Sequence, residues 1–184
     1  DGEIMFGLNM IVHKGRTIFI GDTCVHEYPT SEQMAEIAIS AARVVRLFGF
    51  KPKVAFVSHS TFGQPLTSRT KHIRKAVDIL KEKEVNFEFD GDMQPDVALN
   101  PEYKNLYPFS NIVGKSNILI MPGQHSAAIS YKIMKTLGDA KVIGPLLIGL
   151  GLPIEIAPLR SSTSEIINLA SIAAYSADII DYKK

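Results

Sequence analysis

Short apolar runs alternate with amphipathic stretches of helical spacing, and this alternation limits the possible folds more than any other feature of the chain. Residues 54–57 form a continuous apolar run, which is typical of a strand covered on both faces. Apolar residues then recur at helical spacing over residues 68–83. Near the start, β-branched runs at 9–13 and 17–20 flank Lys14-Gly15 and predict an antiparallel hairpin. We therefore expect a three-layer αβα fold of the α/β class with a mixed sheet.

The same periodicities predict the remaining elements. Helices are expected over residues 31–47, 92–99, 125–137 and 162–182, with Thr30 or Ser31 capping the first and Ser162 or Thr163 the last. Strands are expected at residues 86–89, 117–121 and 142–148, and residues 154–157 are expected to close the sheet. Asp90-Gly91-Asp92 is expected to break the strand before it. The apolar stripe of the 31–47 helix can belong to the core or to a dimer contact, and both interpretations stay open.

Composition limits the functions that the chain can have. Its 184 residues, 46% of them hydrophobic, suit one domain with a substantial core. Twenty basic and nineteen acidic residues are scattered along the chain, which argues against a nucleic-acid or membrane partner. A single cysteine, Cys24, and the lack of a long apolar run favour the cytoplasm. The chain opens Asp1-Gly2-Glu3 without an initiator Met, so we expect it to be a fragment of a longer protein.

Five motifs together point to one family. They are VAFVSHSTFG at 54–63, FDGDMQPDVA at 89–98, GKSNILIMP at 114–122, ISYK at 129–132 and KVIGPLLIGLGLPIEIAPLRSSTSEIIN at 141–168. In order and spacing they resemble the second lobe of phosphotransacetylases, the phosphate acetyl- and butyryltransferases. The resemblance implies an isocitrate/isopropylmalate dehydrogenase-like fold, with residues 1–184 as the second lobe and the last helix, about 162–182, packing on a first lobe outside this chain.

The last motif departs from the family where the family performs its chemistry. Counting back without gaps from Ile166, the family's Ser falls on Pro158 and its Arg on Leu159, while its helical Asp corresponds to Glu165. Proline has neither a hydroxyl nor an N–H, and leucine has no charge, so neither can bind a thiol or stabilise a transferring acyl group. We therefore expect no catalytic residue in this chain.

Arg160 allows a second alignment of this turn. A one-residue deletion would place Arg160 on the family's Arg, but no serine precedes it, since Ser161 and Ser162 follow. Arg160 can contact a phosphate of coenzyme A through its planar guanidinium, or it can be solvated at the surface. Both interpretations stay open.

Two further segments narrow the resemblance. GLNMIVHKGRTIFIGDT at 7–23 and MPGQHSA at 121–127 are similar to the phosphotransacetylase-like C-terminal domain of bacterial NADP-dependent malic enzymes. This resemblance implies a parent malate dehydrogenase (oxaloacetate-decarboxylating) that converts malate to pyruvate. Its NADP and divalent metal, Mg or Mn, would lie in an N-terminal domain outside this chain, and the chain itself would hold no cofactor. The domain would sense acetyl-CoA as an allosteric effector and form a homo-oligomer, expected to be a dimer.

The expected acetyl-CoA site consists of polar and turn residues in the family's motifs. They are Ser60, Thr61, Asn117, His125, Ser126, Tyr131, Gly144, Pro145, Arg160, Ser161 and Glu165. His125 and Ser126 open a helix whose free N–H groups can accept a phosphate or carboxylate, but an ordinary helix start explains them equally well. No side chain of the chain is expected to bind a metal.

Two other constellations have simpler explanations. Asp90, Asp92 and Asp96 have a spacing that can hold a divalent cation, but a strand end and a cap for the helix around Pro95 are the favoured roles. Neighbours in the 58–60 segment, Ser-His-Ser, point in opposite directions when extended, which argues against a nucleophile and base.

Three hypotheses about function remain. The chain is a non-catalytic effector-binding domain of a malic enzyme, or an active phosphate acetyltransferase that converts acetyl-CoA and phosphate to acetyl phosphate and coenzyme A, or an oligomeric module whose pocket has decayed. The first is favoured because the turn at Pro158 and Leu159 lacks the family's reactive side chains.

Overall fold

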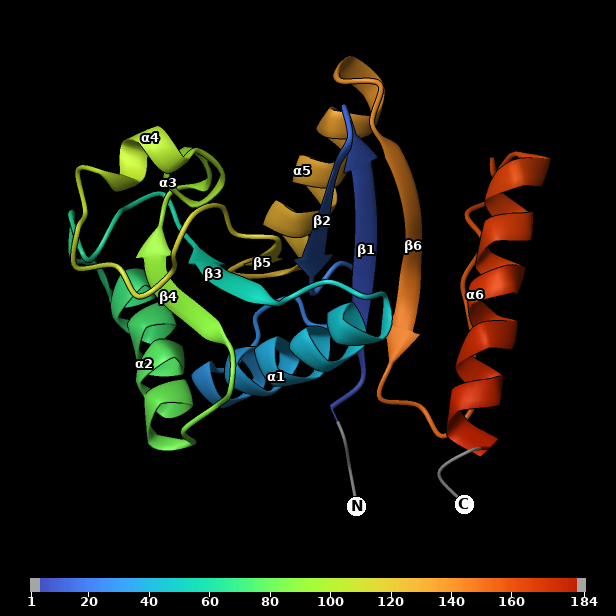
Figure 1. The fold of residues 1–184 in the computed structure, drawn as a ribbon, viewed down its shortest axis with the longest axis horizontal. Coiled ribbons are helices and arrows are strands. Elements are labelled where there is room, and N and C mark those ends of the chain that lie inside the picture. The colour runs from blue at the N-terminus through green and yellow to red at the C-terminus, as the bar shows by residue number, and fades with distance from the viewer. Residues whose placement is uncertain (1–3, 182–184) are drawn as a thin grey trace.

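A computed structural model describes residues 4–181, which fold as a six-stranded sheet between two layers of helices (Figure 1). The strands are β1 (Phe6–His13), β2 (Arg16–Gly21), β3 (Lys53–Val57), β4 (Glu88–Met93), β5 (Ile118–Ile120) and β6 (Lys141–Ile148). The helices are α1 (Ser31–Leu47), α2 (Ser68–Glu82), α3 (Pro95–Leu99), α4 (Pro101–Lys104), α5 (Gln124–Leu137) and α6 (Thr163–Asp181). The expected three-layer αβα fold with a mixed sheet is confirmed.

The sheet has the order β4-β3-β5-β2-β1-β6, and β1 runs against both of its neighbours. Pairing is parallel between β2 and β5, β5 and β3, and β3 and β4, so β1 alone opposes the other five strands. The predicted hairpin is the β1–β2 pair, and both residues of its turn, Lys14 and Gly15, have positive φ angles. The carboxyl ends of five strands therefore meet at one edge of the sheet.

Two apolar clusters hold the layers together. α1 and α2 pack on one face of the sheet, and α3 and α5 pack on the other. Thr30 and Gln33 form a reciprocal capping box at the start of α1, as the sequence predicts for Thr30. Because Met34, Ile37 and Ala41 are completely buried in the first cluster, the α1 stripe belongs to the core of this chain.

The acidic segment of β4 corrects a prediction. Asp90-Gly91-Asp92 does not break the strand, which continues to Met93, and α3 starts at Pro95 after Gln94 instead of at Asp92. Buried Asp90 accepts hydrogen bonds from the backbone N–H groups of Gly91 (2.9 Å) and Asn111 (2.7 Å), which offset its burial. Gly91 allows β4 to approach β3, because a Cβ there would lie 2.8 Å from a backbone oxygen.

The segment before α6 corrects a second prediction. Residues 154–157 do not close the sheet, since only an isolated bridge joins Glu155 to Leu146. Pro153 and Pro158 flank this segment, and neither has the N–H that a continuous strand ladder needs. β6 is therefore the edge strand, and α6 lies alongside it (Figure 1).

Two predictions touch the ends of the chain. The expected end of the last helix, Tyr182, and the opening Asp1-Gly2-Glu3 lie outside the described residues. Among residues 4–181, no helix has both the length and the apolar composition needed to cross a bilayer.

Candidate functional site

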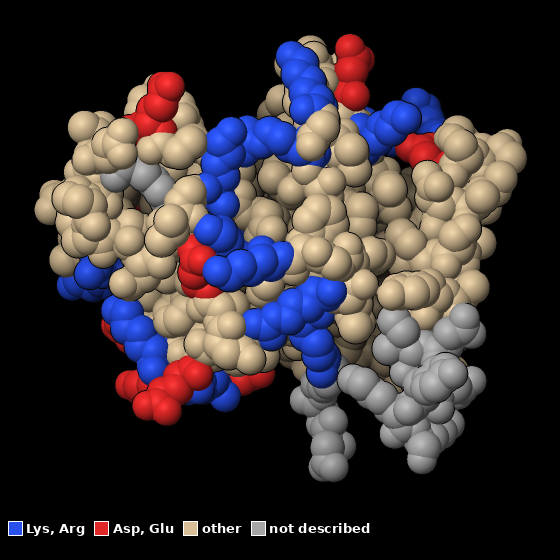
Figure 2. Space-filling model, in the orientation of Figure 1, with Lys and Arg blue, Asp and Glu red and all other residues tan. Residues whose placement is uncertain are grey.

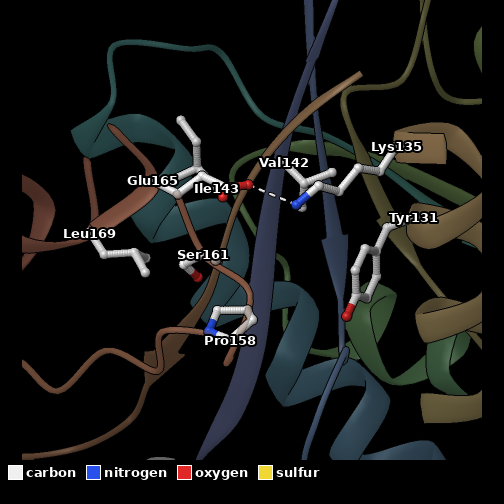
Figure 3. A pocket seen from close by; sticks show the side chains of 9 residues that line it. Tyr131, Lys135, Val142, Ile143, Pro158, Ser161, Glu165 and Leu169 are labelled. Carbon is white, nitrogen blue, oxygen red and sulfur yellow. Dashed lines mark hydrogen bonds and ion pairs between the residues drawn. The ribbon is translucent and has the colours of Figure 1, made fainter. Parts of the chain in front are cut away.

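A small cavity lies where α5, β6 and α6 meet, and four of the expected site residues line it (Figure 3). Its volume is about 40 Å³, and its lining consists of Tyr131, Lys135, Val142, Ile143, Gly144, Pro158, Ser161, Glu165 and Leu169. A cavity of that size holds a few water molecules at most. A larger ligand would therefore need a further wall from another part of a larger protein.

An ion pair between Lys135 and Glu165 spans the cavity from α5 to α6 (Figure 3). The two charged atoms, Nζ and Oε1, are 2.7 Å apart. The other carboxylate oxygen accepts hydrogen bonds from the backbone N–H (2.7 Å) and hydroxyl (3.0 Å) of Ser162. Bonding by Lys135 first, and by the Ser162 N–H second, lowers the pKa of Glu165 to about 2. Glu165 is therefore held as an anion and is a poor proton acceptor near neutral pH.

The turn before α6 supplies a hydroxyl to the cavity but no cation. Pro158 and Ser161 line it, with the backbone N–H of Ser161 donating to the carbonyl oxygen of Pro158 at 2.9 Å. Leu159 points fully into solvent, and Arg160 is exposed and is not among the lining residues. The backbone N–H of Glu165 donates to the Ser162 hydroxyl (3.3 Å), so the predicted capping role of Ser162 is confirmed. Ser161 and Arg160 thus do not form a hydroxyl–guanidinium pair inside the cavity.

Asn9 is a polar residue of this region that the sequence prediction missed. It is completely buried in β1, and a Cβ at Gly144 would lie 2.8 Å from its Oδ1, so Gly144 and Asn9 are in close contact. Oδ1 accepts a hydrogen bond from Thr23, whereas the buried Nδ2 has no partner among the described residues. Such an unpaired buried donor is uncommon. The signal in the sequence is an amide in the middle of an apolar strand.

Ser60 and Thr61 lie after β3 in a different polar network. The completely buried Ser60 hydroxyl donates to Asp92, whose carboxylate also accepts the Gly63 backbone N–H at 3.0 Å. Thr61 Oγ1 accepts the backbone N–H of Gln94 at 3.2 Å. Asp92 therefore fixes the 58–63 loop, and the expectation that it caps the following helix is wrong.

Asn117 and the start of α5 are also placed by contacts within the chain. The Asn117 side chain accepts the backbone N–H of Lys53 (2.8 Å) and donates to the carbonyl oxygen of Lys51 (2.9 Å), which ties β5 to the start of β3. Ser126 donates its hydroxyl to the Gly123 carbonyl oxygen at 2.8 Å. His125 is mostly exposed, 3.4 Å from Glu27. None of these three expected site residues lines the cavity.

The three aspartates proposed as a possible cation site are used by the chain itself. Asp90 and Asp92 accept hydrogen bonds from neighbouring loops, and Asp96 accepts one from Val97. Within residues 4–181 no group of three or more His, Cys, Asp or Glu side chains is arranged to hold a metal ion. The divalent-cation alternative for these residues is therefore not supported.

Of the eleven expected effector residues, the structure gathers Tyr131, Gly144, Ser161 and Glu165 around one cavity. Pro145 follows Gly144 in β6, beside the register shift between Leu8 and Met10 of β1. Lys135 joins the set, although its sequence position gave no signal, because its role depends on a partner thirty residues away.

The family model for phosphate acetyl/butaryl transferase matches residues 1–174. The NADP-dependent malic enzyme of Rhizobium meliloti is 45% identical over 96% of this chain, which spans 23% of that protein. The phosphate acetyltransferase of Acetivibrio thermocellus is 34% identical, covering 91% of this chain and 51% of its own length. A crystal structure of a phosphotransacetylase from Streptococcus pyogenes superposes with a TM-score of 0.89 at 30% identity, over 95% of this chain and 54% of that one.

The family match covers both the hairpin and the cavity, from β1 through the first half of α6. The chain spans about a quarter of the malic enzyme relative and about half of each transferase. It belongs to the phosphate acetyl/butaryl transferase family.

Proposed function

We propose that this chain is the second lobe of a C-terminal, non-catalytic regulatory domain of an NADP-dependent malic enzyme, and that it helps to bind acetyl-CoA as an effector. The parent would oxidatively decarboxylate malate to pyruvate in the cytoplasm, with NADP and Mg²⁺ or Mn²⁺ bound outside this chain. The observation that carries the proposal is the turn before α6, where Pro158 lines the cavity and Leu159 points into solvent, so that neither offers a hydroxyl or a cation to the cavity.

The chemistry of the turn supports the non-catalytic role. Proline at 158 faces the cavity and supplies no proton donor, and Leu159 points into solvent. Glu165 forms an ion pair with Lys135 and is held as an anion with a pKa of about 2. An acyl transfer needs donors aimed at the developing oxyanion, and a base with a pKa near the working pH. Pro158, Leu159 and Glu165 provide neither such a donor nor such a base.

The surface of α6 supports a first lobe outside this chain. Between Glu165 and Asp178 the helix has no charged residue, yet Ile166, Ile167 and Tyr175 are each about half exposed. Figure 2 shows that the face over α6 and β6 is nearly free of charged side chains. An apolar patch of this kind marks a contact surface. Since each transferase relative is about twice as long as this chain, we propose that its remaining half corresponds to the lobe that covers α6.

The size of the cavity supports a site shared between lobes. About 40 Å³ is too small for the acyl-pantetheine end of a coenzyme A thioester, so the chain would supply one wall of the site. The proposed wall contains the Tyr131 hydroxyl, the Ser161 hydroxyl and the unpaired Asn9 amide behind Gly144. Binding would change the activity of a distant site only if acetyl-CoA has different affinities for two quaternary states of a homo-oligomer, expected to be a dimer through this domain.

Calorimetry on the parent protein with both lobes tests this proposal. We expect saturable binding of acetyl-CoA and, for Asn9→Leu, affinity reduced about ten-fold through loss of an amide donor. Asn105→Leu is the matched control, because it makes the same amide-to-leucine change at an exposed position at the end of α4, away from both the cavity and α6. Absence of binding in the unmutated protein would favour a purely oligomeric module instead.

An active phosphate acetyltransferase is the second candidate. The 34% identity to the Acetivibrio thermocellus enzyme and the Ser161 hydroxyl facing the cavity favour it. It requires a cation from elsewhere to take the place of Leu159. Formation of acetyl-CoA from acetyl phosphate and coenzyme A by the two-lobe protein would support this candidate and overturn the first.

A further inference from the structure

A second cavity opens under the β1–β2 hairpin, at the end of the sheet opposite the carboxyl ends of the parallel strands. Its volume is about 180 Å³. The hairpin forms one wall, and the ends of α3 and α5 form the other. None of its lining residues belongs to the cavity beside α6.

Strand register explains how the hairpin wall combines apolar and basic groups. Ile11 pairs with Ile18 and His13 pairs with Arg16 across the two antiparallel strands. Because alternate residues of a strand share a face, all four side chains project to the face covered by α3 and α5. The two isoleucines form the inner part of the wall, and the two basic residues form its outer end.

The opposite wall is apolar, with its backbone polar groups already paired. Leu99, Met134 and Ala140 line it. The carbonyl oxygen of Met134, at the end of α5, accepts the N–H groups of Gly138 (3.0 Å) and Ala140 (3.2 Å). Pairing of this carbonyl reduces the negative partial charge that a helix end would otherwise present to a bound anion.

Positive charge gathers at the outer end. One guanidinium nitrogen of Arg16 donates to the Leu99 carbonyl oxygen at 3.0 Å and joins the two walls. This is the one hydrogen bond that Arg16 makes within the described part of the chain, so its other donors are open to a ligand. Lys14 lies in the adjoining hairpin turn, while Asp139 supplies one opposing carboxylate in the turn after α5.

We propose that this cavity binds a small aliphatic monocarboxylate. Its hydrocarbon chain would lie between the isoleucines and Met134, and its carboxylate would meet the guanidinium of Arg16, whose planar fork suits two oxygens. A volume of about 180 Å³ accommodates a chain of about four or five carbon atoms. The site is separate from the proposed acetyl-CoA wall, so either proposal can fail without the other.

A methyl NMR titration of the parent protein with butanoate tests the site, with butanamide as an uncharged ligand of the same shape. We expect saturable shifts of the Ile11, Ile18 and Met134 methyl signals, with a dissociation constant on the order of 1 mM for so small a ligand. Butanamide should bind about ten-fold more weakly, because it forms no charge-assisted bond with Arg16. Shifts that do not saturate with butanoate would overturn the proposal, and so would equal affinities for the two ligands.

Arg16→Gln removes the charge from an exposed position, so the variant should keep its fold. Its affinity for butanoate should fall about ten-fold while its affinity for butanamide stays unchanged. Arg69→Gln is the control, since Arg69 stacks on Tyr28 at the other side of the sheet. Unchanged butanoate affinity in Arg16→Gln would exclude Arg16 as the anchor and contradict the proposed site.

Discussion

α1 and α6 are both long helices with many apolar residues, but their environments are opposite. Both are rich in alanine, and each starts at a hydroxyl residue paired with a Gln or Glu three positions later. Nine residues of α1 are buried by contacts with the sheet and with the neighbouring α2. In α6, up to the last residue whose burial is described, only Leu169 is buried.

The difference shows that the apolar composition of a helix predicts that it will be buried, but not which part of the protein will bury it. α1 is buried against the sheet of this chain. α6 lies beside an edge strand, with a stripe that this chain only partly covers. The cavity beside Pro158 lies next to the start of α6, so the partly uncovered helix and the proposed effector wall are neighbours.

The largest expected effect separates the two helices directly. Ile37 of α1 is completely buried, and Ile167 of α6 is 58% exposed. Ile37→Ala should lower the free energy of unfolding by about 3 kcal/mol through lost burial and a new cavity. In this chain without a covering lobe, Ile167→Ala should change it by less than about 0.5 kcal/mol. Urea denaturation measures both, and similar losses would mean that α6 is packed as tightly as α1.

A smaller effect is expected from the half-buried carboxyl between the two helices. Glu155 lies in a cavity lined by the end of α1 and by α6, and burial raises its pKa to about 7. The folded chain then binds a proton that the unfolded chain has released, so stability should fall as the pH rises from about 4.5 to 7. Solvent screening limits this loss to about 1 kcal/mol.

Glu155→Gln tests that carboxyl, because an amide keeps the shape without the titration. The free energy of unfolding should then depend less on pH across this interval, with Glu84→Gln, at a turn after α2, as control. An unchanged pH profile in Glu155→Gln would place the carboxyl in water and weaken the described contact between α1 and α6.

The smallest effect concerns the ion pair that joins α6 to α5. Lys135→Met should reduce stability by only a few tenths of a kcal/mol, since the pair is partly exposed. The pKa of Glu165 should rise from about 2 toward its ordinary value, and NMR titration of the side chain measures this. The stability from the pair is present above about pH 4.5 and is lost as the pH falls toward 2. Lys71→Met, on the far face of α2, should leave this pKa unchanged.

Most of the fold could be predicted from the sequence because periodicity reports burial. The hairpin, α1 with its Thr30 cap, β3, α2 and the capped start of α6 follow from local patterns. β4 could not be predicted correctly, because the burial of Asp90 and Asp92 is offset by hydrogen-bond donors about twenty to thirty residues away. The 154–157 segment has the composition of a strand, but prolines at its borders prevent a continuous ladder.

The site was less predictable than the fold. Motif positions identified Tyr131, Gly144, Ser161 and Glu165, which do share a cavity. They could not show that Ser60 is buried against Asp92, or that Lys135 would neutralise Glu165, because both contacts form only when distant segments meet. Asn9 was visible as a polar residue in an apolar strand, but the sequence could not show that its Nδ2 is buried without a partner.

One measurement tests the central claim, that the turn before α6 has kept its place and lost its chemistry. The two-lobe protein and its Pro158→Ser, Leu159→Arg double variant would be assayed for acetyl-CoA formation from acetyl phosphate and coenzyme A, after calorimetry with acetyl-CoA. Our account predicts that the unmutated protein binds acetyl-CoA and shows no turnover above the uncatalysed rate. Turnover by the unmutated protein would contradict the account.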